Sequence, residues 1–191
     1  MTERHALLWA LILNASLAGI EIVAALWSRS VALMADAVDF VEDSTIFALA
    51  LVVGASKPEA KRRFGLVVAG LMALPGLAAL WQVWRQLASG MVPEGGTIWA
   101  VSALALAANL ATAAVILAAR RGPAPASLGL RAAWLSSRND ALANVAMIGA
   151  GVAVSLTGSG LPDIVVGVAV ALLHLSGGWA ILRGALAEPS A

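Results

Sequence analysis

Residues 30–43 read Ser30-Val-Ala-Leu-Met-Ala-Asp36-Ala-Val-Asp39-Phe-Val-Glu42-Asp43, an apolar segment that carries acidic side chains at helical spacing. Asp36, Asp39 and Asp43 fall at positions i, i+3 and i+7, so in a helix they share a sector about 60° wide. A carboxylate is costly to bury among apolar groups, and inside a membrane it marks a functional site by default. The segment therefore predicts a helix with one acidic face that serves a ligand.

A second segment offers a matching set of oxygen atoms. Asp140 has Ser136 four residues before it and Asn144 four residues after it, so one helical face would present all three side chains. If this face meets the acidic face at 30–43, the two form an oxygen-lined cage for a cation. The predicted metal ligands are Asp39, Asp43, Asp140, Ser136 and Asn144, with Asp36 and Glu42 as accessory candidates.

The composition indicates a membrane protein. Of the 191 residues, 61% are hydrophobic and 12% are charged, and the mean hydropathy is +0.90. Soluble domains average about 25% charged residues. The net charge of +1 offers no basic surface for nucleic acid, and the lack of cysteine excludes disulfides and thiolate metal sites. The lipid bilayer is the expected surrounding.

Six apolar segments have the length of about 20 residues that a spanning helix needs. They lie near residues 6–27, 32–54, 64–88, 97–119, 130–156 and 162–183. No interval between them is long enough for a soluble domain. We expect residues 1–191 to form a single transmembrane domain, an all-α bundle of six membrane-spanning helices.

Basic residues set the expected orientation of these helices. They gather at alternate ends of the segments, as in Arg4, Lys61-Arg62-Arg63, Arg120-Arg121 and Arg183. By the positive-inside rule, both termini then face the cytoplasm. We expect a multi-pass protein of the cell's inner (plasma) membrane.

This orientation places the acidic residues at similar depths. Asp39, Asp43 and Asp140 lie roughly 10 to 17 Å along their helices, in a hydrocarbon core about 30 Å thick. Carboxyl groups there prefer to be protonated unless a divalent cation stabilises the anionic form. Metal and protons therefore compete for the same oxygens, which is the physical basis of an antiporter that alternates between inward-open and outward-open states.

Other interpretations of single residues stay open. The three aspartates could instead pair with Arg29, Arg138 or asparagine side chains and be structural. Asp36 fits an entrance site or a helix start, and Glu42 fits a pore-facing or a structural position. For several other residues a structural role is expected. Asn14, Glu21 and Asn109 are expected to form interhelical hydrogen bonds, and His174 is expected to occupy a core position. Asp163 is expected to be a helix-start carboxylate, and Gly149 and Gly151 are expected to allow close helix packing.

At these residues the chain resembles the cation diffusion facilitator family of metal-efflux transporters. The segment at 30–43 is similar to the family's helix-2 signature, in which His or Asp precedes Asp by four residues. Arg131-Ala-Ala-Trp-Leu-Ser136-Ser-Arg-Asn-Asp140 resembles its helix-5 signature, usually His, three residues, Asp. The resemblance covers nearly the whole chain. It implies that Asp39, Asp43 and Asp140 occupy transport-site positions in a six-helix bundle, usually a homodimer, that exchanges cytoplasmic divalent metal for protons.

Two departures from the family pattern affect the expected chemistry. Ser136 stands where the family has His, so the ligand set is all oxygen and suits harder ions such as Mn²⁺. Asn144 or Asn139 is a candidate for the missing donor. Typical members of the family have a cytoplasmic C-terminal metal-sensing domain. We expect no counterpart of it here, so dimerisation would rest on membrane contacts.

The sequence thus predicts a transporter rather than an enzyme. Its substrate would be a divalent ion of the Zn, Co, Cd, Mn or Fe class, exported from the cytoplasm in exchange for protons, and no cofactor is expected. One alternative is a non-transporting membrane protein that binds metal or serves as a partner. Another is a metal-dependent enzyme of phospholipid head-group transfer, whose longer acidic pattern is missing here.

Overall fold

The computed structural model describes residues 3–53, 77, 79–120 and 128–187, and their regular secondary structure is all helical, with short turns between the helices. The labelled helices are α1 (Glu3–Ser28), α2 (Val31–Val53), α4 (Gly95–Arg120), α5 (Leu128–Thr157) and α6 (Leu161–Ala187). A further helical segment covers residues 79–89. The prediction of an all-helical protein is confirmed for the described part of the chain. Most of the predicted third helix, near 64–88, lies outside the described residues, as does the basic run at 61–63.

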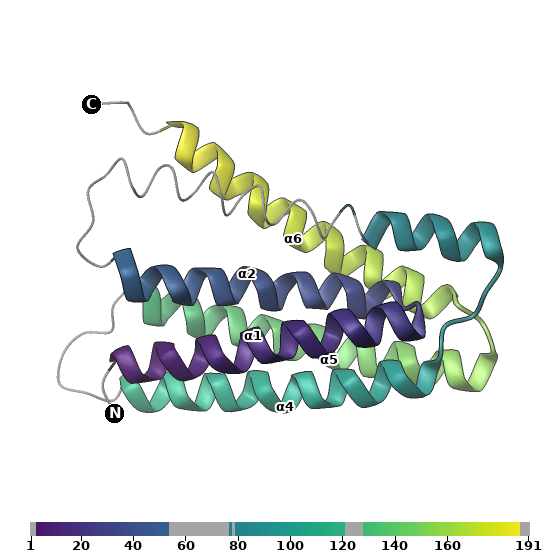
Figure 1. The fold of residues 1–191 in the computed structure, drawn as a ribbon, viewed down its shortest axis with the longest axis horizontal. Coiled ribbons are helices and arrows are strands. Elements are labelled where there is room, and N and C mark those ends of the chain that lie inside the picture. The colour runs from purple at the N-terminus through teal and green to yellow at the C-terminus, as the bar shows by residue number, and fades with distance from the viewer. Residues whose placement is uncertain (1–2, 54–76, 78, 121–127, 188–191) are drawn as a thin grey trace.

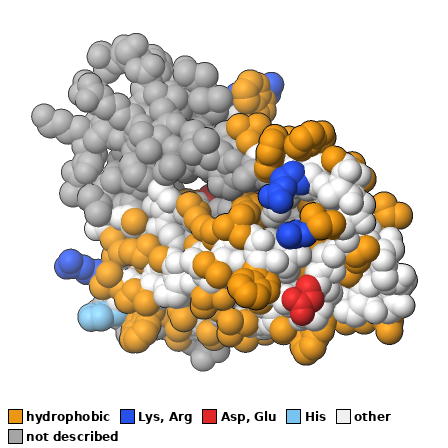
Figure 2. Space-filling model, turned by 45° about the vertical axis from the view of Figure 1, so that its right-hand side comes forward, with side chains coloured by type: hydrophobic (Ala, Val, Ile, Leu, Met, Phe, Trp, Pro, Cys, Tyr) orange, Lys and Arg blue, Asp and Glu red, His pale blue; other side chains and the backbone are white. Residues whose placement is uncertain are grey.

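Three described helices are long and apolar enough to cross a membrane. They are Arg4–Ser28, Gly95–Ala119 and Asp140–Thr157, and Leu161–Leu173 is a shorter apolar stretch. The 23 residues of α2 suffice in length, but four of its side chains are acidic. The outer surface is apolar: Figure 2 shows hydrophobic side chains over most of the described face and only isolated charged ones. Trp9, Trp27 and Trp99 are among the exposed side chains.

The helices form a bundle around a shared interior. In Figure 1, α1, α2, α4 and α5 run side by side along the long axis, and α6 is inclined to them. Helix α1 packs against α2 and α4, α4 against α5, and α6 against α2 and α5. The interior where α1, α2, α4 and α5 meet is therefore shared by four helices.

Close packing between α4 and α5 depends on glycine. A Cβ atom on Gly151 would lie 2.6 Å from the backbone nitrogen of Trp99, and one on Gly95 would lie 2.5 Å from the carbonyl oxygen of Gly151. A Cβ on Gly149 would meet nothing within 4 Å. The expected packing role holds for Gly151 and is wrong for Gly149, because the two residues point in different directions around α5.

The start of α2 is capped from another helix. Arg29 takes a left-handed backbone conformation (φ 60°) that separates α1 from α2. The Ser30 hydroxyl accepts the Leu33 N–H at 3.1 Å and donates to Asp163 of α6. The Asp163 carboxylate also accepts the N–H of Val31 at 2.8 Å. Asp163 does lie in the first turn of its own helix, but it stabilises the first turn of α2, where free N–H groups attract an anion.

Replacing Asp163 by alanine is expected to lower the free energy of unfolding by about 3 kcal/mol, because it leaves buried donors at the start of α2 without an acceptor. Asp163→Asn keeps one carbonyl oxygen and is expected to cost less. Thermal unfolding of the detergent-solubilised protein measures both. Equal melting temperatures for wild type and Asp163→Ala would show that the cap adds no stability.

Three clusters of buried apolar side chains are numbered here from the N-terminal end of α1. A fourth cluster, which includes Val31, Ala79 and Val170, joins α2, the segment at 79–89 and α6. The first contains Ala6, Leu7, Ala10, Phe47 and Ile116. The second contains Leu17, Ala18, Phe40 and Ala105. The third contains Ala25, Ala32, Leu33, Met34, Ile98, Met147 and Val154. All three join α1, α2 and α4, so they fix how these helices are aligned along their length.

Candidate functional site

A layer of polar side chains lies between the first and second apolar clusters. On α1, Asn14 falls between Ala10 and Leu17, one helical turn from each. On α2, Asp43 falls in the same way between Phe40 and Phe47. On α4, Asn109 and Thr112 fall between Ala105 and Ile116. Residues three or four apart share a helix face, so these side chains enter the same interior. Asn14, Asp43, Asn109 and Thr112 are called the first polar layer.

A second polar layer follows between the second and third clusters. It contains Glu21 of α1, Asp36 of α2 and Ser102 of α4, all with 0% of their surface exposed. Glu21 interacts electrostatically with Asp36 and, less strongly, with Asp39. Polar and apolar layers therefore alternate along the bundle, and the acidic face predicted for residues 30–43 points into both polar layers.

Helix α5 brings a further carboxylate to the same interior. Asp140 interacts most strongly with Asp39, then with Asp43 and Asp36. Asp140 and Asp39 are each 7% exposed and Asp43 is 2% exposed. Two acidic segments about 100 residues apart in the sequence thus meet inside the bundle and point away from its outer surface.

The structure places the remaining predicted site residues as follows. Asn144 is fully buried, its Nδ2 donates to the Asp140 carbonyl oxygen at 3.0 Å, and its Oδ1 has no hydrogen-bond partner among the described residues. Glu42 is half-buried on α2 and has interactions of its own. Ser136 belongs to α5, but its side chain lies outside the described part of the structure, as do those of Asn139 and His174.

The gathered carboxylates do not converge on one point. Among the described residues, no three Asp, Glu or His side chains form a group that could by themselves hold a metal ion. Any cation bound here must therefore draw the acidic side chains closer or take ligands of other kinds. Carbonyl oxygens of asparagine are the other oxygen ligands that hard cations accept.

The buried asparagines on α1 and α4 do not behave as expected. Asn14 Nδ2 donates to the carbonyl oxygen of Ala10 in its own helix at 2.8 Å, not to another helix. Asn14 Oδ1 and both side-chain polar atoms of Asn109 have no partner among the described residues. The expected interhelical hydrogen bonds are therefore wrong for both residues. Their seven-residue spacing, from Asn14 to Glu21 and from Ser102 to Asn109, is the sequence signal that each pair shares one buried face.

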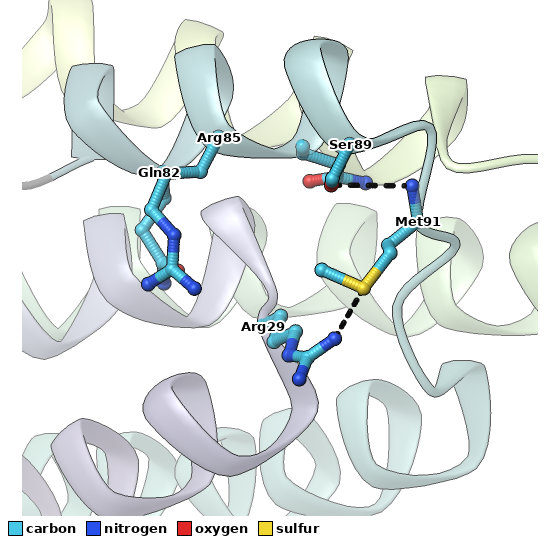
Figure 3. Close-up of a pocket in the computed structure, with 6 residues that line it drawn as sticks. Arg29, Gln82, Arg85, Ser89 and Met91 are labelled. Carbon is cyan, nitrogen blue, oxygen red and sulfur yellow. Dashed lines mark hydrogen bonds between the residues drawn. The ribbon is translucent and has the colours of Figure 1, made fainter.

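A pocket elsewhere in the bundle is lined by basic and not by acidic side chains. It lies between the α1–α2 turn and the helical segment at 79–89. Figure 3 shows Arg29 and Arg85 at this pocket, with Arg29 donating to the sulfur of Met91. Its lining residues are Arg29, Gln82, Arg85, Gln86, Ser89 and Met91. Two guanidinium groups without an acidic lining residue repel a cation, so this pocket does not extend the acidic site.

Comparison with known proteins places the chain in a family. The family profile of the cation efflux transmembrane domain matches residues 7–188. The zinc transporter ZitB of Escherichia coli (strain K12) is 29% identical over 194 residues, which cover 95% of this chain and 61% of ZitB. The metal cation efflux system protein CzcD of Cupriavidus metallidurans is 25% identical over 178 residues, which cover 87% of this chain and 55% of CzcD. The chain therefore spans less than two thirds of the length of either relative.

The family match and the buried acidic interior agree on the kind of protein. The profile covers all five labelled helices, including both helices that bring their carboxylates together. The resemblance seen in the acidic signatures is confirmed, and this multi-pass membrane protein belongs to the cation efflux family, whose members are transporters and not enzymes.

Proposed function

We propose that this protein exports a divalent metal ion from the cytoplasm in exchange for protons, and that Asp39, Asp43 and Asp140 hold the ion. The observation that carries the proposal is the meeting of Asp140 on α5 with Asp39 and Asp43 on α2, inside the bundle. Buried carboxylates are costly, and they are retained inside membranes where an ion or a proton needs them. The relatives support the same proposal, since ZitB is named a zinc transporter and CzcD a metal cation efflux system protein.

Proton exchange follows from the chemistry of these carboxylates. Removed from water, a carboxyl group favours its protonated form, whereas a bound dication favours the anionic form. Metal arriving from the cytoplasm therefore displaces protons, and protons arriving from outside displace the metal. The apolar clusters on either side of the polar layers would block ion flow until the helices move relative to one another.

The proposed ligand set is made of oxygen atoms. Ser136 and Asn144 flank Asp140 by one turn in each direction, and Asp36 and Glu42 are accessory candidates on α2. Oxygen ligands suit Mn²⁺ better than a site containing imidazole does. The relative ZitB is named a zinc transporter, so Zn²⁺, Co²⁺, Cd²⁺, Mn²⁺ and Fe²⁺ together form the substrate class to test.

The proposal also includes the arrangement in the membrane. Six spans with both termini in the cytoplasm, in a single transmembrane domain of the inner membrane, fit the apolar outer surface and the distribution of basic residues. A homodimer is the proposed assembly. Fluorescence labelling of single cysteines placed near either terminus checks the orientation, because the chain has no cysteine of its own.

Purified full-length protein in liposomes tests the transport function. With an acidic lumen, we expect uptake of at least one of the five metals, coupled to a rise in lumen pH, and none in protein-free liposomes. A proton–cation exchanger that collapses the pH gradient is expected to stop the uptake. Uptake that continues without the gradient would contradict proton exchange, and no uptake of any metal would contradict the transport function itself.

A further inference from the structure

The first polar layer contains side-chain amide atoms for which the described part of the bundle supplies no partner. Asn109 is 0% exposed and Asn14 is 1% exposed. Neither side-chain atom of Asn109 has a hydrogen-bond partner among the described residues, and Asn14 Oδ1 also has none. Buried amides in membrane helices normally bond to a neighbouring helix or to water. Two amides in one layer, with atoms that have no partner on any other described helix, indicate that the layer accommodates a ligand.

Packing on both sides directs these amides toward the carboxylates. Ala105 of α4 shares the second cluster with Leu17 of α1 and Phe40 of α2, and Ile116 of α4 shares the first cluster with residues of the same two helices. Asn109 lies between Ala105 and Ile116 on this face, so it faces α1 and α2 at the level of Asn14 and Asp43. Asp140 of α5 interacts most strongly with Asp39 and also with Asp43, so it lies close to this layer.

The chemistry of this layer is that of a hard-cation site. Two carboxylates and two neutral amide oxygens from four helices match the ligands that Mn²⁺, Mg²⁺ and Ca²⁺ take in proteins. The described carboxylates do not form a metal-binding group by themselves, whereas amide oxygens complete the set without adding negative charge to the interior.

We infer that Asn14 and Asn109 are direct ligands of the transported cation, and that they select for oxygen-seeking ions such as Mn²⁺ over Zn²⁺. Helices α1 and α4 then close the site together with α2 and α5. This inference rests on the proposed function, because it takes the ion held by Asp43 and Asp140 to be the substrate.

Metal binding to the purified full-length protein in detergent tests the inference. Asn14→Leu and Asn109→Leu replace each amide by a side chain of similar size without oxygen. We expect each to weaken Mn²⁺ binding on the order of tenfold or more, with a smaller loss for Zn²⁺. Gln86→Leu is the matched control: Gln86 is also a buried amide with an unpartnered oxygen, but it lies beside Gly160, away from both polar layers. We expect it to leave Mn²⁺ binding unchanged.

An aspartate variant separates a ligand from a structural residue. Asn109→Asp keeps an oxygen and adds charge, so a ligand role predicts Mn²⁺ binding at least as tight as in wild type. If Asn109 has a purely structural role, Asn109→Asp is expected to lower the melting temperature and to lose Mn²⁺ affinity. Asn109→Asp therefore decides the question if Asn109→Leu does not fold.

The outcomes also distinguish this inference from the proposed function. If wild type and both leucine variants bind Mn²⁺ equally but Asp140→Asn does not bind it, the ligand role is wrong and the proposed transport site still stands. If wild type binds neither Mn²⁺ nor Zn²⁺, both this inference and the proposed function are wrong.

Discussion

Asp140→Asn is expected to abolish metal-coupled proton flux in liposomes, and Asp43→Asn is expected to do the same. Asparagine keeps the size of the side chain and one oxygen, but it removes the negative charge that neutralises a buried dication. Removing one member of a buried charge pair costs about 3 to 5 kcal/mol, which corresponds to a loss of roughly 100-fold or more in affinity. Uptake of radioactive or fluorescently detected metal, measured together with lumen pH, checks both variants.

The control for this experiment is an acidic residue away from the polar layers. Glu94 is exposed at the start of α4, where its carboxylate accepts a hydrogen bond from the Thr97 hydroxyl at 2.8 Å. Glu94→Gln makes the same change from carboxylate to amide, and we expect flux close to that of wild type. Unchanged flux in both aspartate variants would reject the proposed site.

Gly151→Val is expected to prevent stable packing of α4 on α5. Its Cβ atom would overlap the backbone of Trp99 at 2.6 Å and approach the Ile98 side chain at 3.0 Å. Backbone atoms cannot move aside as a flexible side chain does, so the two helices must separate. Overpacking of this kind costs about 3 kcal/mol or more. The melting temperature and the folded yield in detergent measure the loss.

Gly149 offers a control within the same helix. A Cβ on Gly149 would meet nothing within 4 Å, so Gly149→Val makes the same exchange two residues away without a clash. We expect its melting temperature to stay within a few degrees of wild type. Equal destabilisation of the two variants would show that glycine matters here through helix flexibility and not through close approach.

Polar and apolar layers alternate along the described bundle, and this alternation fits the proposed transport function. The first and third apolar clusters lie on opposite sides of the two polar layers, and each joins α1, α2 and α4. Packed apolar side chains of α1, α2 and α4 therefore lie on both sides of the polar layers in the described part of the bundle. In the proposed exchange, metal and protons would bind the same oxygens, so replacing one by the other would keep the buried charge balanced.

Helix α6 has a different relation to this interior. Its Asp163 caps the start of α2, and a Cβ on Gly167 would lie 2.6 Å from the Ala32 nitrogen. Helix α6 therefore holds the N-terminal end of α2 through close backbone contact and through the Asp163 cap. These contacts lie at the N-terminal end of α2, which is the end away from the first apolar cluster.

Much of the site could be predicted from the sequence because it depends on local periodicity. Asp36, Asp39 and Asp43 share a face of α2 whatever surrounds that helix, and a buried acidic face among apolar residues already indicates an ion. The same holds for Asp140 with Asn144 on α5. Composition likewise predicted the helices and their membrane setting. Several segments of that length and hydropathy are stable as helices inside a lipid bilayer and not in water.

The partners of these residues on other helices could not be predicted in this way. Interhelical hydrogen bonds were expected for Asn14, Glu21 and Asn109. Glu21 of α1 does interact with Asp36 of α2, whereas Asn14 bonds within its own helix and Asn109 has no partner among the described residues. Which residues of α1 and α4 lie level with Asp43 depends on how those helices slide and rotate against α2. That alignment is set by Ala, Leu and Phe contacts in the apolar clusters, which look alike in sequence at many alternative registers.

The sequence by itself determined a helical membrane protein with a buried acidic stripe, because helix periodicity and hydrophobicity are properties of each segment alone. Only the tertiary structure decided that Asp140 meets Asp39, that asparagines from α1 and α4 share the layer of Asp43, and that Asp163 caps a helix more than 130 residues earlier. These pairings depend on contacts between distant segments, and only the packed bundle selects one register among them.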